Sequence, residues 1–374
     1  MERRRGLRPL LPAGQAGLSG EAGGPALLDL ASNDYLGLSG HPAIRAAAAA
    51  ELETSGLGAG ASRLVSGSRP VHQALESALA SWLGRERALL FPSGFQANLA
   101  AVAALSDRHS LVLADRLIHH SLLNGVRVSG ARLQRVAHND AADLERRLIA
   151  ARRDSASRRL LVLCESLYSM EGTTPPLQQL QALCSRHQAA LLVDEAHALG
   201  VLGPGGRGLA HGLQDVALLS GTFGKALGSG GAFLAGDALV IEWLLQQAGA
   251  FRYTTALAPP LAAGALAALH WLQEQEQQGQ SPGTALLERA ERWREALVAA
   301  GWPRPPGCGP ILPLLVGDDA RALALQRQLE GAGLLGIAIR PPTVPPGTAR
   351  LRLVLRRDLP AGSLQRLLTA LGSP

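Results

Sequence analysis

The stretch VALLSGTFGKALGSGGAFLAG, residues 216–236, consists of two apolar runs separated by a glycine-rich segment. The runs VALLSGT (216–222) and GAFLAG (231–236) have the length and the bounding turn residues of buried β-strands. Lys225 lies between them, and it is the only lysine among the 36 Lys and Arg residues of this 374-residue chain. Because arginine keeps its proton and cannot act as an amine nucleophile, Lys225 is a candidate for amine chemistry.

The sequence before this stretch alternates short apolar runs with helical patterns. Further strands are expected at LVLAD (111–115), LLVLCES (160–166) and ALLVDEA (190–196), with helices at 140–154 and 176–188 between them. This alternation predicts an α/β domain with a mostly parallel sheet flanked by helices. In such sheets ligands bind at the carboxyl ends of the strands, so polar residues at those ends are candidates for chemistry.

The pattern changes after about Phe251, where helices rich in Ala, Leu, Gln and Arg precede two strand-like runs, ILPLLVG (311–317) and ARLRLVL (349–355). This change predicts a second, smaller α+β domain. We therefore expect three parts, which are an N-terminal segment packing on the small domain (1–32), a large α/β domain (33–250) and a small C-terminal domain (251–374).

The composition excludes several classes of protein. At 47% hydrophobic and 18% charged residues the chain is globular. The net charge of +6 comes from scattered arginines, and only 3% of residues are aromatic, so we expect no nucleic-acid partner. The two long uncharged stretches, 88–106 and 253–273, are interrupted by prolines or polar residues, so we expect no membrane span. Three cysteines without CxxC spacing favour a reduced, cytoplasmic compartment and no structural zinc site.

Asp194 ends the apolar run LLVD, and His197 follows three residues later. A carboxylate at the end of a strand is able to hold a cation or to keep a heteroaromatic nitrogen protonated. The pair is equally compatible with part of a metal site and with an aspartate that caps the next helix.

Small residues surround Lys225 and leave room for a bulky group to approach its amine, while their backbone N–H groups suit an anion. Thr222 adds a hydroxyl that is free to donate. An amine beside an anion cradle, with Asp194 upstream, is the set of groups that pyridoxal 5'-phosphate requires, since its aldehyde needs a lysine and its ring nitrogen needs an acid.

Two other segments carry weaker signals. In LFPSGFQAN (90–98) an apolar run breaks at Ser93 and Gly94 before a helix of small residues, which is either a phosphate seat or an ordinary turn. ADRLIHHSLLNG (114–125) contains adjacent histidines, His119 and His120, which suit stacking on a flat ring or an exposed helix surface.

The chain resembles the α-oxoamine synthases, a branch of the fold-type-I pyridoxal-phosphate enzymes. The resemblance covers about nine-tenths of the chain. The segments that carry it are LASNDYLGLSGHP (30–42), SGSRPVHQALE, SGFQAN, HND (138–140), SMEG (169–172), VDEAHALGVLGPGGRG, GTFGKALGSGGA and IRPPTVPPGTARLRL (339–353).

This resemblance implies residue roles toward the cofactor. Lys225 would form the Schiff base, Asp194 would pair with the ring nitrogen, His119 would stack on the ring, and His197 would bond the phenolate side. These four would be the catalytic residues. The other residues implied to contact the cofactor are Gly94, Phe95, Ser169, Thr222, Thr254 and Thr255, of which one of the last two would reach the phosphate in the partner subunit of a homodimer.

The resemblance also implies substrates. Asn33 and Arg352 would hold an amino-acid carboxylate, and Thr343 and Arg3 would contact substrate, with Arg4 and Arg5 as adjacent registers for Arg3. The segment 339–353 is most similar to the members that join L-alanine to a pimeloyl thioester, carried by coenzyme A or acyl carrier protein. Three alternatives remain, which are a sibling that condenses glycine with a shorter acyl thioester, a cofactor-binding scaffold without catalysis, and a metal-dependent hydrolase built on Asp194, His197 and His119.

Overall fold

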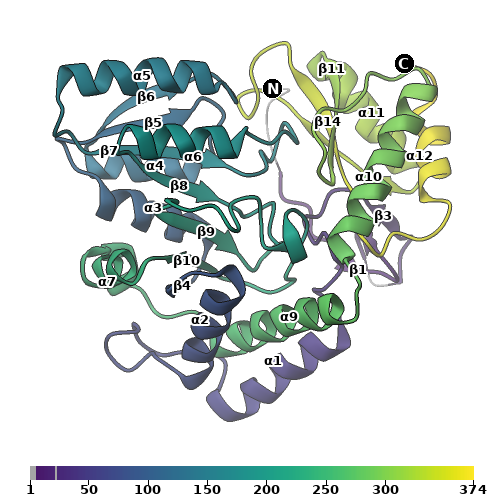
Figure 1. The fold of residues 1–374 in the computed structure, drawn as a ribbon. Helices are drawn as coiled ribbons and strands as arrows, with labels where there is room; N and C mark the ends of the chain where they lie inside the picture. The colour runs from purple at the N-terminus through teal and green to yellow at the C-terminus, as the bar shows by residue number, and fades with distance from the viewer. Residues whose placement is uncertain (1–5, 22) are drawn as a thin grey trace. The chain divides into compact units, whose positions relative to one another are not determined.

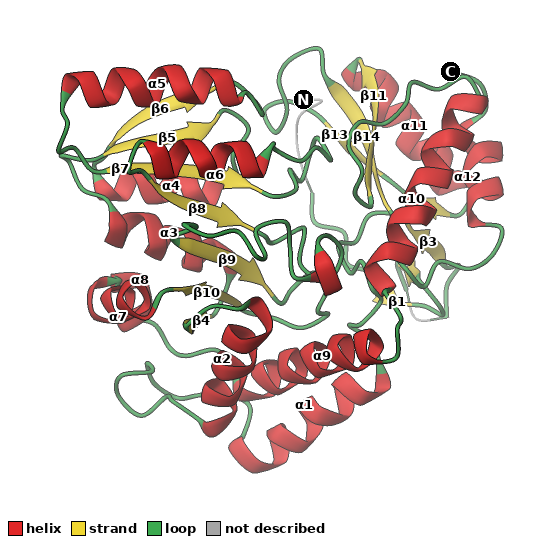
Figure 2. Cartoon of the chain, viewed as in Figure 1, coloured by secondary structure: helices red, strands yellow, loops and turns green. Residues whose placement is uncertain are grey.

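The computed structural model describes residues 6–21 and 23–374, and its described part divides into two compact units. The larger unit contains residues 38–169 and 173–284. The smaller one contains the residues up to Gly37, the short insertion Met170–Gly172 and Ala285–Pro374. Figure 1 shows the course of the chain and Figure 2 its helices and strands.

A seven-stranded sheet forms the centre of the larger unit, in the order β4-β10-β9-β8-β7-β5-β6. Only β10 runs antiparallel to its neighbours β4 and β9, while the other pairs are parallel. The strands are β4 (Arg87–Phe91), β5 (Leu111–Asp115), β6 (Arg132–Val136), β7 (Leu160–Glu165), β8 (Ala190–Asp194), β9 (Leu218–Thr222) and β10 (Ala232–Gly236). The expected mostly parallel α/β fold is confirmed.

Both faces of this sheet are buried, because its strands are apolar at successive positions rather than at alternate ones. In β5, Val112 and Ala114 join one hydrophobic core, while Leu111 and Leu113 join the core on the opposite face. The first core is closed by α3 (Gly94–Leu105), α4 (His120–Ser129), α7 (Ala238–Gln247) and α8 (Gly249–Arg252). The second is closed by α5 (Ala141–Asp154) and α6 (Leu177–Arg186).

The division between the units differs from the expected boundary at residue 251. Helix α9 (Pro259–Gln277) packs against α1 (Pro42–Ser55) and α2 (Pro70–Leu83), so residues 251–284 lie with the larger unit. Its buried face is made of small residues such as Ala262 and Ala265, which let the helices approach closely. The composition of α9 resembles that of the helices after it, which is why the sequence misplaced the boundary. A single 3₁₀ turn, η1 (Pro204–Gly206), completes the helices of this unit.

The smaller unit holds two sheets. The first has the order β1-β2-β3-β12 and joins β1 (Leu11–Pro12), β2 (Gly17–Ser19) and β3 (Leu27–Asp29) to β12 (Leu334–Leu335). The second has the order β11-β14-β13, with β11 (Ile311–Gly317), β13 (Ile337–Ile339) and β14 (Ala349–Val354). The helices of this unit are α10 (Pro282–Ala299), whose first turn contains the boundary, α11 (Asp319–Gly331) and α12 (Ser363–Leu371).

The predicted strands agree with the structure to within two residues at each end, and 111–115 and 311–317 agree at both ends. The edge strand β6, with sequence RLQRV, was missed because three of its five residues are polar and break the apolar run. Cys164, Cys184 and Cys308 are all free thiols. None of the described helices combines the length and the apolar character needed to cross a bilayer.

Candidate active site

A cavity of about 220 Å³ lies in the larger unit, where β7, β8 and β9 end. It is the edge of the sheet at which ligands bind in open α/β folds. Seven of the predicted site residues line it, namely Gly94, Phe95, His119, Asp194, His197, Thr222 and Lys225, together with Asn98, Glu165, Ala196, Ser220 and Gly221.

Asp194 is the last residue of β8 and is 5% exposed. The backbone N–H of Ala196 donates to its Oδ1 over 2.9 Å, and the side chain of Asn98 donates to its Oδ2 over 2.7 Å. The carboxylate is therefore held in one orientation while it faces the cavity. Within residues 6–21 and 23–374, no cluster of three or more His, Cys, Asp and Glu side chains has the arrangement of a metal site.

Lys225 lies in the loop between β9 and β10, and this loop is tied together by its backbone. The N–H of Gly228 donates to the carbonyl of Lys225, and the N–H of Ser229 donates to that of Phe223, both over 2.9 Å. Gly228 has φ +63°, and a Cβ on it would approach the backbone N of Ser39 to 2.3 Å. Only glycine fits there, so the loop that positions the amine depends on it.

The N-terminus of α3 forms one wall of the cavity. Ser93 caps this helix by accepting from the N–H of Gln96, which leaves the N–H groups of Gly94 and Phe95 at the first turn. Two such amides at the positive end of a twelve-residue helix suit an anion.

Thr222 differs from expectation in one respect. Its hydroxyl donates to the carbonyl of Gly231 over 2.9 Å and accepts from the N–H of Gly224 over 3.2 Å. The hydroxyl is therefore engaged in holding the lysine loop rather than free to donate. Thr222 lines the cavity, but the sequence could not show this local contact.

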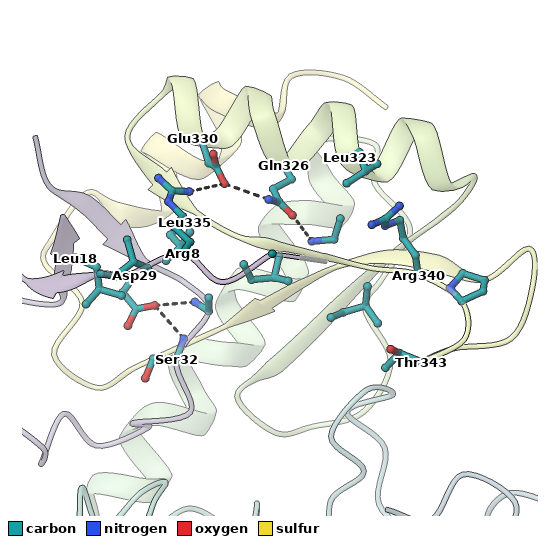
Figure 3. Close-up of a pocket in the computed structure, with 17 residues that line it drawn as sticks. Arg8, Leu18, Asp29, Ser32, Leu323, Gln326, Glu330, Leu335, Arg340 and Thr343 are labelled. Atoms are coloured by element: carbon teal, nitrogen blue, oxygen red, sulfur yellow. Dashed lines mark hydrogen bonds and ion pairs between the residues drawn. The ribbon is translucent and has the colours of Figure 1, made fainter. Parts of the chain in front are cut away.

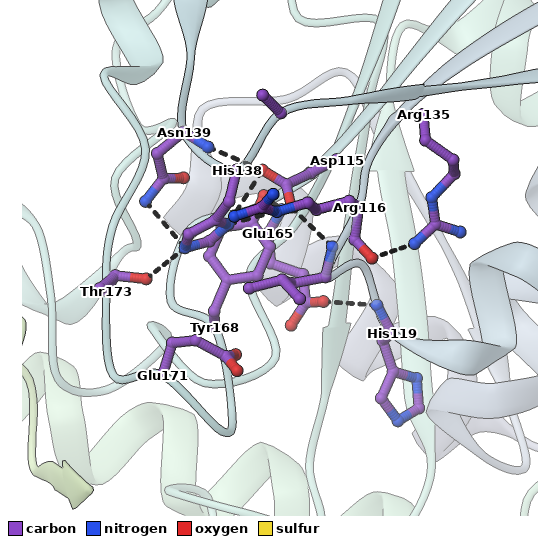
Figure 4. A network of polar contacts seen from close by, with 12 residues as sticks. Asp115, Arg116, His119, Arg135, His138, Asn139, Glu165, Tyr168, Glu171 and Thr173 are labelled. Atoms are coloured by element: carbon purple, nitrogen blue, oxygen red, sulfur yellow. Dashed lines mark hydrogen bonds and ion pairs between the residues drawn. The ribbon is translucent and has the colours of Figure 1, made fainter. Parts of the chain in front are cut away.

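His119 is the N-cap of α4, and its backbone N–H donates to Glu165 Oε1 over 2.6 Å (Figure 4). This contact ties the start of α4 to the end of β7. Loss of solvent around the ring lowers the pKa of His119 below its ordinary value, and the charges of Lys225 and His120 act in the same direction. Asp194 acts against them, and the net result is a ring that stays neutral near pH 7.

The remaining predicted residues lie elsewhere. Ser169 is half-buried and follows β7 without lining the cavity. Thr254 and Thr255 lie in the segment between α8 and α9, and they do not line it either. Arg3, with Arg4 and Arg5, lies outside the described residues.

Asn33 and Arg352 meet within the smaller unit. Nη2 of Arg352 donates to Asn33 Oδ1 over 2.9 Å, and the Tyr35 hydroxyl donates to the same oxygen over 3.4 Å. Burial lowers the pKa of the Arg352 guanidinium and raises that of the Tyr35 phenol, while the interaction between the two opposes both changes. Arg352 is only 7% exposed, so its guanidinium is fixed in place.

Thr343 lines a cavity of about 770 Å³ in the smaller unit (Figure 3). Its apolar wall includes Leu323, Leu335 and Ile339. The charged residues that line it are Arg8, Arg340, Asp29 and Glu330, and Arg8 pairs with Glu330 over 3.0 Å. Figure 3 shows Arg8 beside Glu330 and Arg340 at the other end of α11. The sequence missed Arg8 because it lies outside the arginine run 3–5 and no local pattern marks it.

The last three residues of the short motif SMEG (169–172) make their contacts within the smaller unit. Arg350 on β14 donates to the carbonyl of Met170 over 2.9 Å and pairs with Glu171 over 3.3 Å. A Cβ on Gly172, whose φ is +67°, would approach the carbonyl oxygen of Ile311 to 2.7 Å. These contacts explain why residues 170–172 belong to the smaller unit although their neighbours in the chain do not.

Comparison with known proteins agrees with this geometry. The family model "Aminotransferase class I and II" matches residues 25–371. A relative from Anaeromyxobacter dehalogenans, named 8-amino-7-oxononanoate synthase, is 45% identical over 373 residues, which cover 99% of this chain and 91% of that protein.

Two solved structures share the fold. A structure of SPT with PLP has a TM-score of 0.90 at 27% identity and covers 97% of this chain and 91% of its own. The 8-amino-7-oxononanoate synthase of Francisella tularensis has a TM-score of 0.77 at 26% identity, with coverages of 92% and 96%. The chain therefore belongs to the aminotransferase class I and II family, together with its 8-amino-7-oxononanoate synthase relatives.

Proposed function

We propose that the protein is an 8-amino-7-oxononanoate synthase, a pyridoxal-phosphate-dependent acyltransferase of biotin biosynthesis. It condenses L-alanine with a pimeloyl thioester and releases carbon dioxide and the thiol of coenzyme A or acyl carrier protein. The observation that carries the proposal is that the one lysine of the chain shares a cavity with a buried, oriented carboxylate and with the N-terminus of α3. The 45% identity to a relative of that name supports the choice of reaction.

The groups around the cavity fit pyridoxal 5'-phosphate. The Lys225 amine would receive its aldehyde, the Asp194 carboxylate its protonated ring nitrogen, and the amides of Gly94 and Phe95 its phosphate. Both oxygens of Asp194 already accept a hydrogen bond, which fixes the direction in which the carboxylate meets a protonated nitrogen. His119 is assigned to the face of the ring.

The other assignments toward the cofactor follow the family resemblance. His197 and Ser169 would contact its phenolate side, and Thr222 would support the phosphate through the loop that it holds.

When bound, this cofactor supplies an electron sink for the negative charge that develops at the alanine Cα. The protein's own residues do the rest. Nζ of Lys225 takes the Cα proton, and the fixed charge of Asp194 keeps the sink effective. Arg352 and Asn33 would hold the alanine carboxylate, so that the bonds to be broken at Cα keep a defined direction.

The acyl substrate is assigned to the cavity of the smaller unit that Thr343 lines. Its apolar wall suits a hydrocarbon chain, and Arg8 or Arg340 suits the distal carboxylate of a pimeloyl group. In the predicted set, Arg3 would join these arginines in binding substrate.

We also propose a cytoplasmic homodimer. The segments 57–65 and 253–256 are joined by a hydrogen bond from the N–H of Ala256 to the carbonyl of Ala61. They expose Leu57, Val65 and Tyr253, each by more than three-quarters of its surface. Such apolar exposure beside Thr254 and Thr255 favours a partner subunit there. Light scattering should give a dimer mass, and a monomer at micromolar concentration would contradict the assignment.

The proton transfer is tested without an acyl donor, by the exchange of the alanine Cα proton with D2O. The holoenzyme should exchange it, and Asp194→Asn should bind the cofactor yet lower the exchange rate about 100-fold or more. Asp115→Asn is the matched control, because Asp115 also ends a strand but binds His138 instead of lining the cavity. Unchanged exchange in Asp194→Asn would contradict its role.

The choice of substrate is tested by mass spectrometry of the products. L-Alanine with pimeloyl thioester should give 8-amino-7-oxononanoate. If the protein turns over glycine and not L-alanine, with acetyl or succinyl thioester as the acyl donor, it belongs to the sibling activities of glycine C-acetyltransferase or 5-aminolevulinate synthase.

A further inference from the structure

Asn98 connects the cavity's key acid to its histidine. This residue lies on α3, is 3% exposed and makes three side-chain hydrogen bonds. Its Nδ2 lies 2.7 Å from Asp194 Oδ2 and 3.0 Å from the Ser121 hydroxyl, and its Oδ1 lies 2.6 Å from the Ser220 hydroxyl. Asn98 therefore donates to both Asp194 and Ser121 through its amide nitrogen.

The direction of each bond follows from Asp194. An ionised carboxylate only accepts hydrogen bonds, so the Asn98 atom facing it must be the amide nitrogen. The second proton of that nitrogen points to Ser121, which therefore accepts with its oxygen. The Ser121 proton is then left for its other partner, Nδ1 of His119, at 2.7 Å.

A second, longer contact acts in the same direction. The backbone N–H of Ser121 also points to His119 Nδ1, over 3.3 Å. A backbone N–H only donates, so this contact favours an acceptor at Nδ1, but it is 0.6 Å longer than the contact with the Ser121 hydroxyl and does not set the tautomer alone. The proton of the neutral ring is therefore on Nε2, while His119 lines the cavity.

We propose that Asn98 and Ser121 are positioning residues that hold His119 as the Nε2–H tautomer and couple that tautomer to the ionised state of Asp194. His119 then offers the cavity a hydrogen-bond donor of fixed direction. The catalytic consequence rests on the proposed function, because the donor would serve the bound substrate. The tautomer itself does not, because the bonds that set it are formed by the protein alone.

The sharpest variant is Asn98→Asp, which keeps the shape of the side chain but removes its donor. Position 98 and Asp194 would then share one proton, and the remaining oxygen at position 98 would accept from Ser121. The Ser121 oxygen would turn its lone pair toward Nδ1, so His119 should become protonated at Nδ1. Asn124→Asp is the matched control, because it makes the same amide-to-acid change on α4. The side-chain hydrogen bond described for Asn124 is the one that it accepts from Arg127.

The readout is the ¹⁵N spectrum of protein labelled in its histidine rings, recorded with and without cofactor, with the His119 signals assigned from His119→Gln. The wild type and Asn124→Asp should show an unprotonated Nδ1, and Asn98→Asp should show a protonated one. Adding Ser121→Ala to Asn98→Asp should remove the reversal. A wild-type His119 protonated at Nδ1, or a reversal that persists without the Ser121 hydroxyl, would overturn the proposal.

The same variants separate this proposal from the proposed function. Asn98→Asp and Ser121→Ala should lower kcat for condensation about tenfold or more while the KM for L-alanine changes less. If the protein does not bind pyridoxal phosphate, the proposed function fails while the tautomer result stands. If the protein binds the cofactor and turns over with His119 in the other tautomer, the proposed function stands and the proposed role of Asn98 and Ser121 is wrong.

Discussion

Nη2 of Arg352 donates a hydrogen bond to Asn33 Oδ1 over 2.9 Å, and this bond joins β14 to a loop 319 positions earlier in the chain. Asn33 thereby contacts one edge of a buried guanidinium. A planar fork held in this way is suited to a carboxylate, which it grips with two parallel bonds.

Arg352→Lys should therefore weaken the binding of the amino-acid substrate. An ammonium group cannot bond Asn33 and grip a carboxylate in two places at once, so the KM for L-alanine should rise about 10- to 100-fold, as expected for the loss of a charged hydrogen bond. Arg350→Lys, two residues away on β14, is the control, because its partner is Glu171. Equal effects of the two changes on that KM would refute the assignment of Arg352.

Arg8→Ala should weaken the binding of the acyl substrate, because it removes the proposed partner of the distal carboxylate. We expect the KM for pimeloyl thioester to rise about tenfold, and that for heptanoyl thioester, which lacks the carboxylate, to change little. Glu330→Gln removes the acid that pairs with Arg8 and should lower the KM for pimeloyl thioester. Loss of affinity for both thioesters in Arg8→Ala would show a structural role instead.

The pH dependence of stability should contain a contribution from Glu195. Burial raises the pKa of this carboxyl from 4.5 to about 7, against hydrogen bonds from the backbone N–H groups of Ala210 and Leu209. Between these two pH values the unfolded chain loses the proton that the folded chain keeps. The contribution is therefore complete below pH 4.5 and is lost as the pH rises through 7, and it amounts to roughly 3 kcal/mol.

Glu195→Gln cannot lose this proton and should lack that part of the pH dependence. The free energy of unfolding, measured in urea, should favour the wild type more at pH 5 than at pH 8. A difference between the two proteins that is the same at both pH values would contradict the raised pKa.

The sequence predicted the sheet well because its strands are buried on both faces and read as continuous apolar runs. It also placed Asp194 and Thr222 at the ends of their strands, and these two residues line the cavity together with five other predicted residues. It could not predict the Asn98 contacts, because they join residues up to 122 positions apart and leave no local pattern. It misplaced the boundary at residue 251 for a similar reason, since α9 packs on α1, which precedes it by more than 200 positions.

If Lys225 carries the cofactor, chemical trapping should find it on that residue. The holoenzyme is reduced with borohydride and digested, and the pyridoxyl group is located by mass spectrometry. Since Lys225 is the only lysine of the chain, we expect a single modified residue, Lys225, and no trapping in Lys225→Arg. A pyridoxyl group on the α-amino terminus alone, or full trapping in Lys225→Arg, would contradict it.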